Sequence, residues 1–527
     1  GSHNSEGHTC SPPSSGLLHS PAHSRAQVRL PAAAPSPFFR YLPVLWCCML
    51  LLLLLALLGA TLTLGTLWLA LLAWLLQRQA QDTCPPGTLH VGFFHPHCDG
   101  GGGGERVLWC LIREMLRVLE QQGTPCCVHV YSTCGQEEQP RVLQRVADTF
   151  GVHVPPHAIR FHSVASSVWM LDPQSFPRFT LLLQSLGSML VAWRALRCFR
   201  PHIFCDTTGH AFTFPVAKLL GGCRVLCYVH YPTISTDMLG LVSRRQSSYN
   251  NSSVISKFQW LTWGKVVYYR IFAWLYGVVG RRADLVLTNS SWTRGHIETL
   301  WRHPQTHLVY PPCDTKSIEE FALPLHARRR PCILSVGQFR PEKDHKLQLA
   351  AWSTLLQQHP EHQGRAQLVL IGGCRTARDE ALLLELRALA ASLGLVEGKD
   401  ILLLPNEPFP SLLSYLGEAL GGLHTMWNEH FGICVVEYMA AGCLTIAHNS
   451  GGPKLDIVVP EGEVGFLAST EQEFADRMHQ VLSMSPDEAA RMRQCARLAV
   501  EKFSEAEFGL RVEECLLPFL TVCANEI

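Results

Sequence analysis

Short apolar runs alternate with amphipathic helical segments along most of this chain, and the whole alternation occurs twice. In the first half the runs are LHVGFF, CCVHVYS, AIRFHSV, HIFCDTT, RVLCYVHY and ADLVLTNS. Beyond a turn-rich stretch at 311–330 it restarts with CILSVG, QLVLIGG, DILLLPN, LHTMW and LTIAHN. Strands that alternate with helices form parallel sheets with helices on both faces. The sequence therefore predicts two Rossmann-like, doubly wound α/β domains, at 88–315 and 325–515, and ligands of such folds bind beyond the carboxyl ends of the strands. We expect the site in a cleft between the domains.

Charge and cysteine content exclude some functions. The 527 residues carry 44 basic and 43 acidic side chains, a net charge of +1, so no overall field favours nucleic acid as a partner. The 21 cysteines are scattered and form no C-x-x-C pair. Buried free thiols in a reducing compartment are a better interpretation than a disulfide framework.

The N-terminal region predicts a membrane attachment. Residues 1–40 have the composition of a disordered segment, and 41–76 hold no charge at all. At about 1.5 Å per residue this run exceeds a hydrocarbon core of roughly 30 Å, so it forms either one tilted transmembrane helix, which we favour, or a hairpin bent at Gly59 and Gly65. A cleaved signal peptide would be shorter and nearer the start.

Five consecutive glycines, at 100–104, separate the run LHVGFF from a helical segment. They match neither a P-loop nor the GxGxxG pattern. A strand-to-helix turn without Cβ atoms lets a ligand approach the backbone, and the new helix presents N–H groups to an anion. Gly102, Gly103 and Gly104 are therefore candidate ligand contacts, with a flexible surface loop as the alternative.

A longer motif lies in the second half: WNEHFGICVVEYMAAGCLTIAHNSGGPKLDIV, at 427–458. Here seven residues separate Glu429 from Glu437, a helix opens at Gly432 and closes at Gly442, and a second turn follows a buried strand. Carboxylates accept hydrogen bonds from vicinal hydroxyls, while backbone N–H groups bind phosphate. The combination predicts a nucleotide-sugar site.

This motif resembles that of the retaining glycosyltransferases with the GT-B fold, whose members carry two glutamates in an EPFGIVLLEAMAAG-like frame followed by a GGP loop. The resemblance covers about residues 88–510. It implies that Glu429 contacts the donor sugar, that Phe431, Gly432 and Ile433 present backbone amides, and that Glu437 holds the ribose.

Two further stretches resemble the same family. SVGQFRPEKDH, at 335–345, is similar to the turn that supplies Arg and Lys to the leaving diphosphate, and Lys343 matches the Lys. Gln338 stands where the family has Arg, which leaves open whether Arg340 takes over that role. In YVHYP, His230 resembles the histidine that hydrogen-bonds the sugar, with a core histidine as the alternative.

Within the family, the sequences of these stretches are most similar to those of GDP-mannose-dependent α-1,2-mannosyltransferases. That resemblance implies GDP-mannose as donor, the dolichol-pyrophosphate-linked Man3GlcNAc2 oligosaccharide as acceptor, and two successive additions giving Man5GlcNAc2 in N-glycan precursor assembly. It also implies an endoplasmic reticulum membrane protein and admits a complex with other glycosylation enzymes. The stretch 258–280, where aromatic residues are interleaved with Lys265 and Arg270, fits either an interfacial segment or a core helix.

The expected chemistry is metal-independent and needs no cofactor, because no DxD-type carboxylate cluster accompanies the proposed pyrophosphate contacts. Lys343, Arg340, the glycine-run amides and the helix N-termini would stabilise the leaving group. Two alternatives remain: a lipid-acceptor GT-B enzyme that uses UDP-N-acetylglucosamine, and a non-catalytic membrane scaffold.

The side of the membrane is predicted from conflicting signals. Basic residues before 41–76 outnumber those after it, which by the positive-inside rule would send the catalytic domain to the lumen. The cysteines and a cytosolic sugar donor favour the opposite, and Asn250, Asn251 and Asn289 lie in N-x-S sequons that a luminal domain would expose. We expect a catalytic domain on the cytosolic face with unmodified sequons.

Overall fold

The computed structural model describes residues 85–235, 237–238 and 259–526, together with the isolated positions 63, 65, 71 and 72. Residues Leu69–Ile527 form one unit that contains both sheets. The expected disordered region at 1–40 and nearly all of the apolar run at 41–76 fall outside the described residues. No helix in the described part is both long and apolar enough to cross a membrane.

The first sheet has seven parallel strands in the order β3-β2-β1-β4-β5-β6-β7. The strands are β1 (Leu89–Phe94), β2 (Cys126–Ser132), β3 (Ile159–Ser163), β4 (Ile203–Asp206), β5 (Arg224–Val229), β6 (Leu285–Thr288) and β7 (Thr306–Leu308). Strands β1, β4 and β6 are buried along their whole length, and β5 is buried after Arg224, because helices cover both faces of the sheet.

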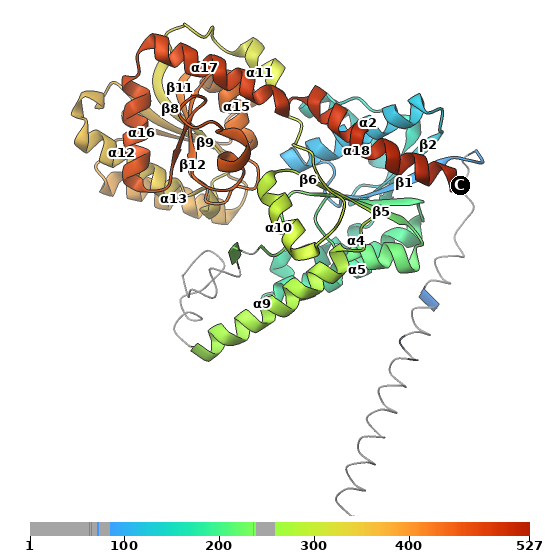
Figure 1. Cartoon of the computed structure of the whole chain (residues 1–527). Coiled ribbons are helices and arrows are strands. Elements are labelled where there is room, and N and C mark those ends of the chain that lie inside the picture. Colours follow the sequence, from blue (N-terminus) through green and yellow to red (C-terminus); the bar gives the residue numbers. More distant parts are fainter. Residues whose placement is uncertain are drawn as a thin grey trace, which may run out of the picture. The chain divides into compact units, whose positions relative to one another are not determined.

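The helices of this domain are α2 (Gly103–Gln121), α3 (Gln139–Phe150), α4 (Ala165–Val168), α5 (Thr180–Cys198), α6 (Thr213–Pro215), α9 (Gln259–Gly280) and α10 (Ser291–Trp301). Side chains of α2 and α3 join one core cluster. Those of α5, α6, α9 and α10 join another. The sheet thus has helices on both faces, as the alternation predicted, and Figure 1 shows this layering.

The second sheet has six parallel strands in the order β10-β9-β8-β11-β12-β13. The strands are β8 (Arg330–Val336), β9 (Gln367–Gly372), β10 (Ile401–Pro405), β11 (Ala419–His424), β12 (Leu444–His448) and β13 (Phe466–Ala468). β11 begins four residues before the strand expected at 423–427, because Gly421 and Gly422 give its first half a weak strand signal. Position 422 has no room for a side chain, because a Cβ on Gly422 would lie 2.4 Å from the Tyr438 ring.

The remaining helices are α11 (Thr315–Phe321), α12 (His345–Gln358), α13 (Ala377–Ser392), α14 (Phe409–Glu418), α15 (Ile433–Ala441), α16 (Glu471–Ser483), α17 (Pro486–Val500) and α18 (Glu505–Asn525). Several begin at side-chain caps: Thr470 accepts a hydrogen bond from the N–H of Glu473, and Ser485 accepts one from Glu488.

Helix α18 leaves the second domain and packs against α2 of the first (Figure 1). Its apolar side chains, Phe508 among them, belong to the first domain's core. Ion pairs reinforce the contact: Glu505 lies 2.9 Å from Arg106 and 2.5 Å from Arg113, and Glu513 lies 2.7 Å from Arg117. The end of the chain therefore ties the two domains together.

Candidate functional site

Three loops meet at the carboxyl edge of the second sheet, as expected for parallel strands. After β8 the chain forms the 3-10 turn η6 (Pro341–Lys343). After β11 it runs through Glu429 to the start of α15, and after β12 it turns at Gly451 into the π-helical turn η8 (Pro453–Ile457). The side chains of these loops form the candidate site.

Glu429 and Lys343 form the central ion pair. The Lys343 Nζ lies 2.6 Å from the Glu429 Oε2, and the same oxygen lies 3.1 Å from the Nε2 of His424 at the end of β11. The Glu429 side chain is 13% exposed and that of Lys343 is 23% exposed. The structure therefore brings together two predicted residues and a third, His424, that sequence reasoning missed.

The cluster fixes the charge of its members. Burial would raise the pKa of Glu429, but the close contact with His424 and the charge of Lys343 outweigh it and hold this pKa below its usual value. Burial would also lower the pKa of His424, but Cys434 and Glu429 raise it to about 9. The pKa of Lys343 is raised because its attraction to Glu429 exceeds the cost of burial. At neutral pH the site holds one carboxylate between two cations.

The backbone around Glu429 is held from two sides. Asn428 adopts the left-handed conformation, with φ of 51°, and its N–H donates to the Ser450 Oγ at 2.7 Å. The Gly452 N–H donates to the Glu429 carbonyl at 2.8 Å. A Cβ on Gly451 would lie 2.2 Å from that carbonyl oxygen, so only glycine fits the turn. The GGP loop thus positions the glutamate.

The start of α15 carries the other expected donor contacts. Gly432 has a φ of 105°, which favours glycine, and Ile433 begins the helix. The Phe431 ring is buried, 5.9 Å from that of Tyr310. The first N–H groups of a helix have no intrahelical partner and can meet a ligand.

Glu437 lies one turn into α15. Burial raises the pKa of its carboxyl, Arg106 of α2 opposes that rise, and Asp314 adds to it. Arg106 also lies 3.7 Å from Asp314 and keeps a buried Nε without a hydrogen-bond partner among the described residues. A partly buried carboxyl group that interacts electrostatically with a partly unpartnered guanidinium is a polar site with unused hydrogen-bonding capacity.

The glycine run of the first domain approaches the second. Helix α2 begins at Gly103, and a Cβ on that residue would lie 2.4 Å from the Ile433 side chain. One expected anion contact is already used: the Gly102 N–H donates to the Glu105 Oε2 at 2.8 Å. The side chain of Glu105 also lies 3.6 Å from His95. A carboxylate of the protein itself therefore caps this helix.

His230 follows β5 and adjoins the glycine run. A Cβ on Gly104 would lie 3.8 Å from the His230 Nε2. This nitrogen is buried and has no hydrogen-bond partner among the described residues. Burial lowers the pKa of His230 to about 4, with a smaller effect of His95, so the ring is neutral at pH 7. A buried nitrogen without a partner suits a ligand hydroxyl.

Arg340 lies apart from this cluster. Its side chain is exposed and lines a cavity with Arg378 and Leu382 of α13. Gln338 contacts its own loop, where its carbonyl accepts from the Arg340 N–H at 2.8 Å. The Lys343 N–H donates to the Arg340 carbonyl at 3.1 Å, but among the described residues no side-chain contact joins Arg340 to Glu429 or Lys343.

Further residues of the site come from contacts between the domains, which sequence spacing does not encode. The Asn428 Nδ2 donates to Asp237 of the first domain at 2.7 Å. The ring of His430 stacks on Tyr231, with centroids 5.0 Å apart, and lies 5.2 Å from Trp292 of α10. Asn428, His430 and Tyr231 adjoin Glu429 or His230 in sequence, which is a signal that could have found them. Asp237 and Trp292 have no such signal.

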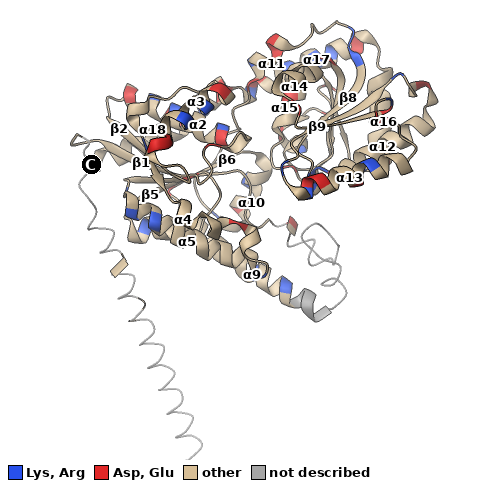
Figure 2. Ribbon diagram, turned by 180° about the vertical axis from the view of Figure 1, so that it is seen from behind, with Lys and Arg blue, Asp and Glu red and all other residues tan. Residues whose placement is uncertain are grey.

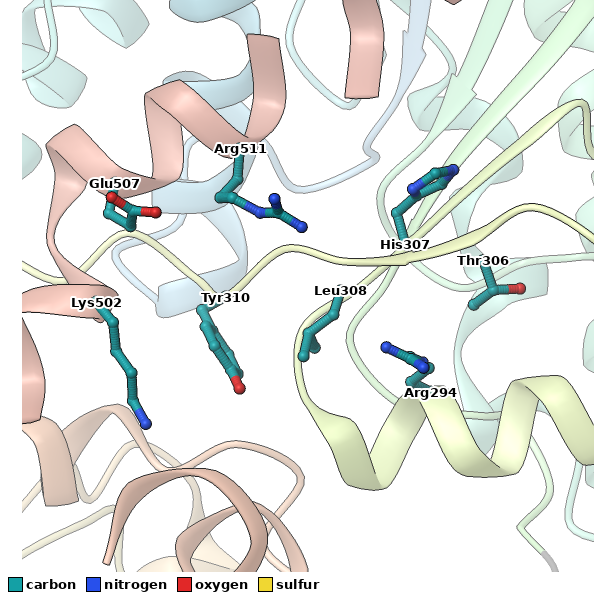
Figure 3. Close-up of a pocket in the computed structure, with 8 residues that line it drawn as sticks. All are labelled: Arg294, Thr306, His307, Leu308, Tyr310, Lys502, Glu507 and Arg511. Atoms are coloured by element: carbon teal, nitrogen blue, oxygen red, sulfur yellow. The ribbon is translucent and has the colours of Figure 1, made fainter. Parts of the chain in front are cut away.

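Two other features lie outside this cluster. A cavity of about 320 Å³ opens between α10, β7 and α18, with Arg294, His307, Lys502 and Arg511 among its lining residues (Figure 3). Two groups have ligand atoms close enough for a metal ion within the described residues: His90, Cys127 and His129, and His359, Glu361 and His479. None of the predicted site residues belongs to either feature.

Comparisons of the sequence with known proteins find related glycosyltransferases. Residues 88–301 match the family model described as ALG11 mannosyltransferase N-terminus, and residues 317–499 match that of glycosyl transferases group 1. The GDP-Man:Man(3)GlcNAc(2)-PP-Dol alpha-1,2-mannosyltransferase of Mus musculus is 44% identical over 453 residues, covering 84% of this chain and 90% of its own. The protein of the same name from Homo sapiens is 44% identical over 425 residues, covering 79% and 84%.

Solved structures share the fold at low sequence identity. Sucrose-phosphate synthase from Thermosynechococcus elongatus has a TM-score of 0.57 and 17% identity, covering 82% of this chain and 100% of its own. The alpha,alpha-trehalose 6-phosphate synthase from Burkholderia multivorans has a TM-score of 0.59 and 12% identity, covering 82% and 99%. Together with the two parallel sheets, these likenesses confirm the predicted GT-B fold.

Proposed function

The chain belongs to the family of GDP-Man:Man(3)GlcNAc(2)-PP-Dol alpha-1,2-mannosyltransferases, and we propose that it transfers mannose from GDP-mannose to the dolichol-pyrophosphate-linked Man3GlcNAc2 oligosaccharide, in two successive additions that give Man5GlcNAc2. The observation that carries the proposal is an identity of 44% over 84% of the chain, which spans both sheets. The names of these relatives do not favour UDP-N-acetylglucosamine as the donor.

The charges of the candidate site support the role of each side chain in this reaction. Glu429 is ionised and held by Lys343, so it is a two-oxygen acceptor for hydroxyls of the transferred mannose. Lys343 and His424 place positive charge where a diphosphate leaves, and such preorganised charge stabilises a transition state without reorganisation. His230, neutral and without a described partner, donates or accepts one further sugar hydrogen bond.

The donor's other parts are assigned by position. Glu437 binds the ribose hydroxyls from within α15, and the amides of Phe431, Gly432 and Ile433 contact the donor near its diphosphate. The glycine run closes the site from the first domain, where Gly103 meets Ile433. Arg340 takes no part unless its loop moves, because its side chain lies with α13.

The transfer proceeds with retention, without a metal and without a resident cofactor. The leaving diphosphate accepts the proton of the acceptor hydroxyl while the mannosyl group is transferred on the same face. Turnover is therefore expected to persist in EDTA, and an absolute requirement for manganese would contradict this mechanism.

The cellular setting follows from the acceptor. A dolichol-linked substrate requires the site to work beside a membrane, which the apolar run at 41–76 would provide, and cytosolic GDP-mannose requires the catalytic domain on the cytosolic face of the endoplasmic reticulum. Other enzymes that act on the same lipid-linked chain are candidate partners in a complex.

Donor binding tests the proposal without a lipid acceptor. The melting temperature of the purified full chain is measured with GDP-mannose, GDP and UDP-N-acetylglucosamine. A ligand at 100 times its Kd stabilises by about 2.7 kcal/mol, so GDP-mannose and GDP should raise the melting temperature by several degrees and the uridine nucleotide should not. A larger rise with UDP-N-acetylglucosamine would overturn the assigned donor.

A further inference from the structure

Two histidines and a cysteine lie together on one face of the first sheet. Strands β1 and β2 pair in parallel, with His90 opposite Cys127 and Gly92 opposite His129. Side chains two positions apart on a strand point to the same face, so Cys127 and His129 share one face of β2. The His90 Nδ1 lies 3.0 Å from the His129 Nε2, and the ligand atoms of all three side chains lie within 4.8 Å of one another. The strand register therefore brings three metal-ligating side chains to one point.

The cluster is buried in a part of the sheet that carries no charge. Cys127 is 3% exposed, His129 2% and His90 9%. Strands β1 and β2 contain no Asp, Glu, Lys or Arg, and both are tan throughout in Figure 2. Phe94, on the same face of β1, belongs to the apolar core. The ligand atoms of the cluster are nitrogen and sulfur, which suit zinc and do not suit Mg²⁺ or Ca²⁺.

The distances within the cluster fit a zinc ion after small movements. Two nitrogens bound to a tetrahedral zinc at about 2.0–2.1 Å are about 3.3–3.4 Å apart, so the His90 Nδ1 and the His129 Nε2 need to separate by only about 0.3–0.4 Å. A sulfur at about 2.3 Å from the same zinc would lie about 3.6 Å from each nitrogen, within the 4.8 Å that the cluster spans. At least one of the two facing nitrogens already carries a lone pair, because their hydrogen bond needs an acceptor.

The ring of His129 is fixed by further contacts. Its other nitrogen, Nδ1, lies 2.9 Å from the Nε2 of His162, and its face stacks on the Phe199 ring with centroids 3.6 Å apart and planes inclined by 6°. A metal-ligating histidine usually donates its second N–H to an acceptor, which fixes the tautomer and the ring orientation. With Nδ1–H donating to His162, the Nε2 lone pair of His129 is directed at the cluster. His162 is partly exposed on β3, the edge strand of the sheet, so the chain of histidines leads from the buried cluster toward solvent.

We propose that His90, Cys127 and His129 bind one zinc ion that cross-links β1 and β2 and stabilises the first domain. The two histidines coordinate as neutral imidazoles, the thiol proton of Cys127 is released to solvent on binding, and water takes the fourth position. The glycine run of the candidate site follows the carboxyl end of β1, whereas His90 lies at the second position of this strand. The zinc therefore takes no part in the transfer reaction, and the proposal is independent of the proposed function.

Metal analysis of the purified full chain tests the site. The chain is incubated with zinc, freed of unbound metal by gel filtration and analysed by mass spectrometry of its metal content. The unmodified chain should retain about one zinc, and Cys127→Ser and His90→Gln should each retain at least fivefold less. His479→Gln provides the matched control, because it changes the other group with metal-ligating spacing, that of His359, Glu361 and His479, and should retain as much zinc as the unmodified chain. Absence of zinc from the unmodified chain, or loss of zinc only in His479→Gln, would overturn the proposal.

Cobalt in place of zinc reports the ligands in the unmodified chain, where no substitution can disturb the fold. A cobalt ion bound by a thiolate and imidazoles in tetrahedral geometry has a sulfur-to-metal charge-transfer band in the near ultraviolet and strong visible bands. Both should appear on loading with Co²⁺, and Cys127→Ser should lose the charge-transfer band. A weak spectrum typical of six oxygen ligands would contradict the site.

Stability and turnover separate this proposal from the assigned activity. Removal of zinc by a chelator should lower the melting temperature of the unmodified chain by about 5 °C or more and leave that of Cys127→Ser unchanged. Turnover measured well below both melting temperatures should change by less than twofold, because the zinc lies away from the candidate site. An unchanged melting temperature after zinc removal would overturn the stabilising role, whereas absence of transfer by the zinc-loaded chain would contradict the proposed function alone.

Discussion

Substitutions of Lys343 and Glu429 should have non-additive effects on stability, and each substitution alone should abolish most of the turnover. The changes are Lys343→Met and Glu429→Gln, singly and combined. Removing one partner of a fully buried ion pair costs about 3–5 kcal/mol, and the partial exposure of Lys343 lowers the expected cost to about 2–3 kcal/mol for each single variant. For a domain of this size that is a fall of about 4–12 °C in melting temperature.

The double variant removes both charges together. It leaves no unpaired ion except His424, which can release its proton, so it should be more stable than the sum of the single losses by about 2 kcal/mol. Turnover with GDP-mannose should nevertheless fall by at least about 10²-fold in all three variants, because each group contacts the donor in its own right.

Thermal unfolding and initial rates on the same purified preparations measure both effects. The pair Lys346–Glu385, 2.9 Å apart and exposed on the same domain, provides the matched control: Lys346→Met/Glu385→Gln should change stability by less than about 0.5 kcal/mol and leave turnover unaltered. Strictly additive losses of stability in the Lys343–Glu429 series, or a double variant that regains turnover, would refute the reasoning.

Three further predictions concern neighbouring groups. The pKa of His424 is raised from 6.5 to about 9, so its contribution to stability should be complete below pH 6.5 and lost as the pH rises through 9. Melting temperatures measured across this pH range should decline in the unmodified protein and stay level in His424→Gln. A decline that persists in this variant would count against the assignment. His230→Phe removes a buried nitrogen without a described partner, so it should lower kcat/KM at least about tenfold without lowering the melting temperature, and a large loss of stability would mean that the ring is structural. Asn289 is 4% exposed at the end of β6, so a glycan there is incompatible with the fold. External protease should digest the protein in intact microsomes, and endoglycosidase should leave its mass unchanged. Protection from the protease would contradict the predicted topology.

Sequence pattern predicted both sheets because their strands are buried on both faces and appear as continuous apolar runs between amphipathic helices. The prediction missed β7 and β13, the short strands at one edge of each sheet. It also placed the start of β11 four residues too late, because Gly421 and Gly422 make room for Ile333 and Tyr438 and packing outweighs strand propensity. The docking of α18 on α2 had no local signal, because its contacts join residues nearly 400 positions apart, such as Arg106 and Glu505.

The candidate site was predictable to the extent that its residues belong to local motifs. Glu429 and Lys343 lie in separate motifs that the parallel sheet brings to one edge, and their contact follows from topology. His424 could not be found in the same way, since a histidine at a strand end has no distinguishing pattern. For Arg340 the local motif was not sufficient. Its position in the turn suggested a diphosphate contact, but in the structure its side chain lies beside α13, which the motif could not predict.

The most direct test of the central claim is a transfer assay with the purified full chain, labelled GDP-mannose and dolichol-pyrophosphate-linked Man3GlcNAc2. The account predicts products one and then two hexoses larger, with both added residues released by an α-1,2-mannosidase, and loss of transfer by at least about 10²-fold in Glu429→Ala. Absence of transfer from GDP-mannose under conditions in which UDP-N-acetylglucosamine is used, or added residues that resist the α-1,2-mannosidase, would contradict it.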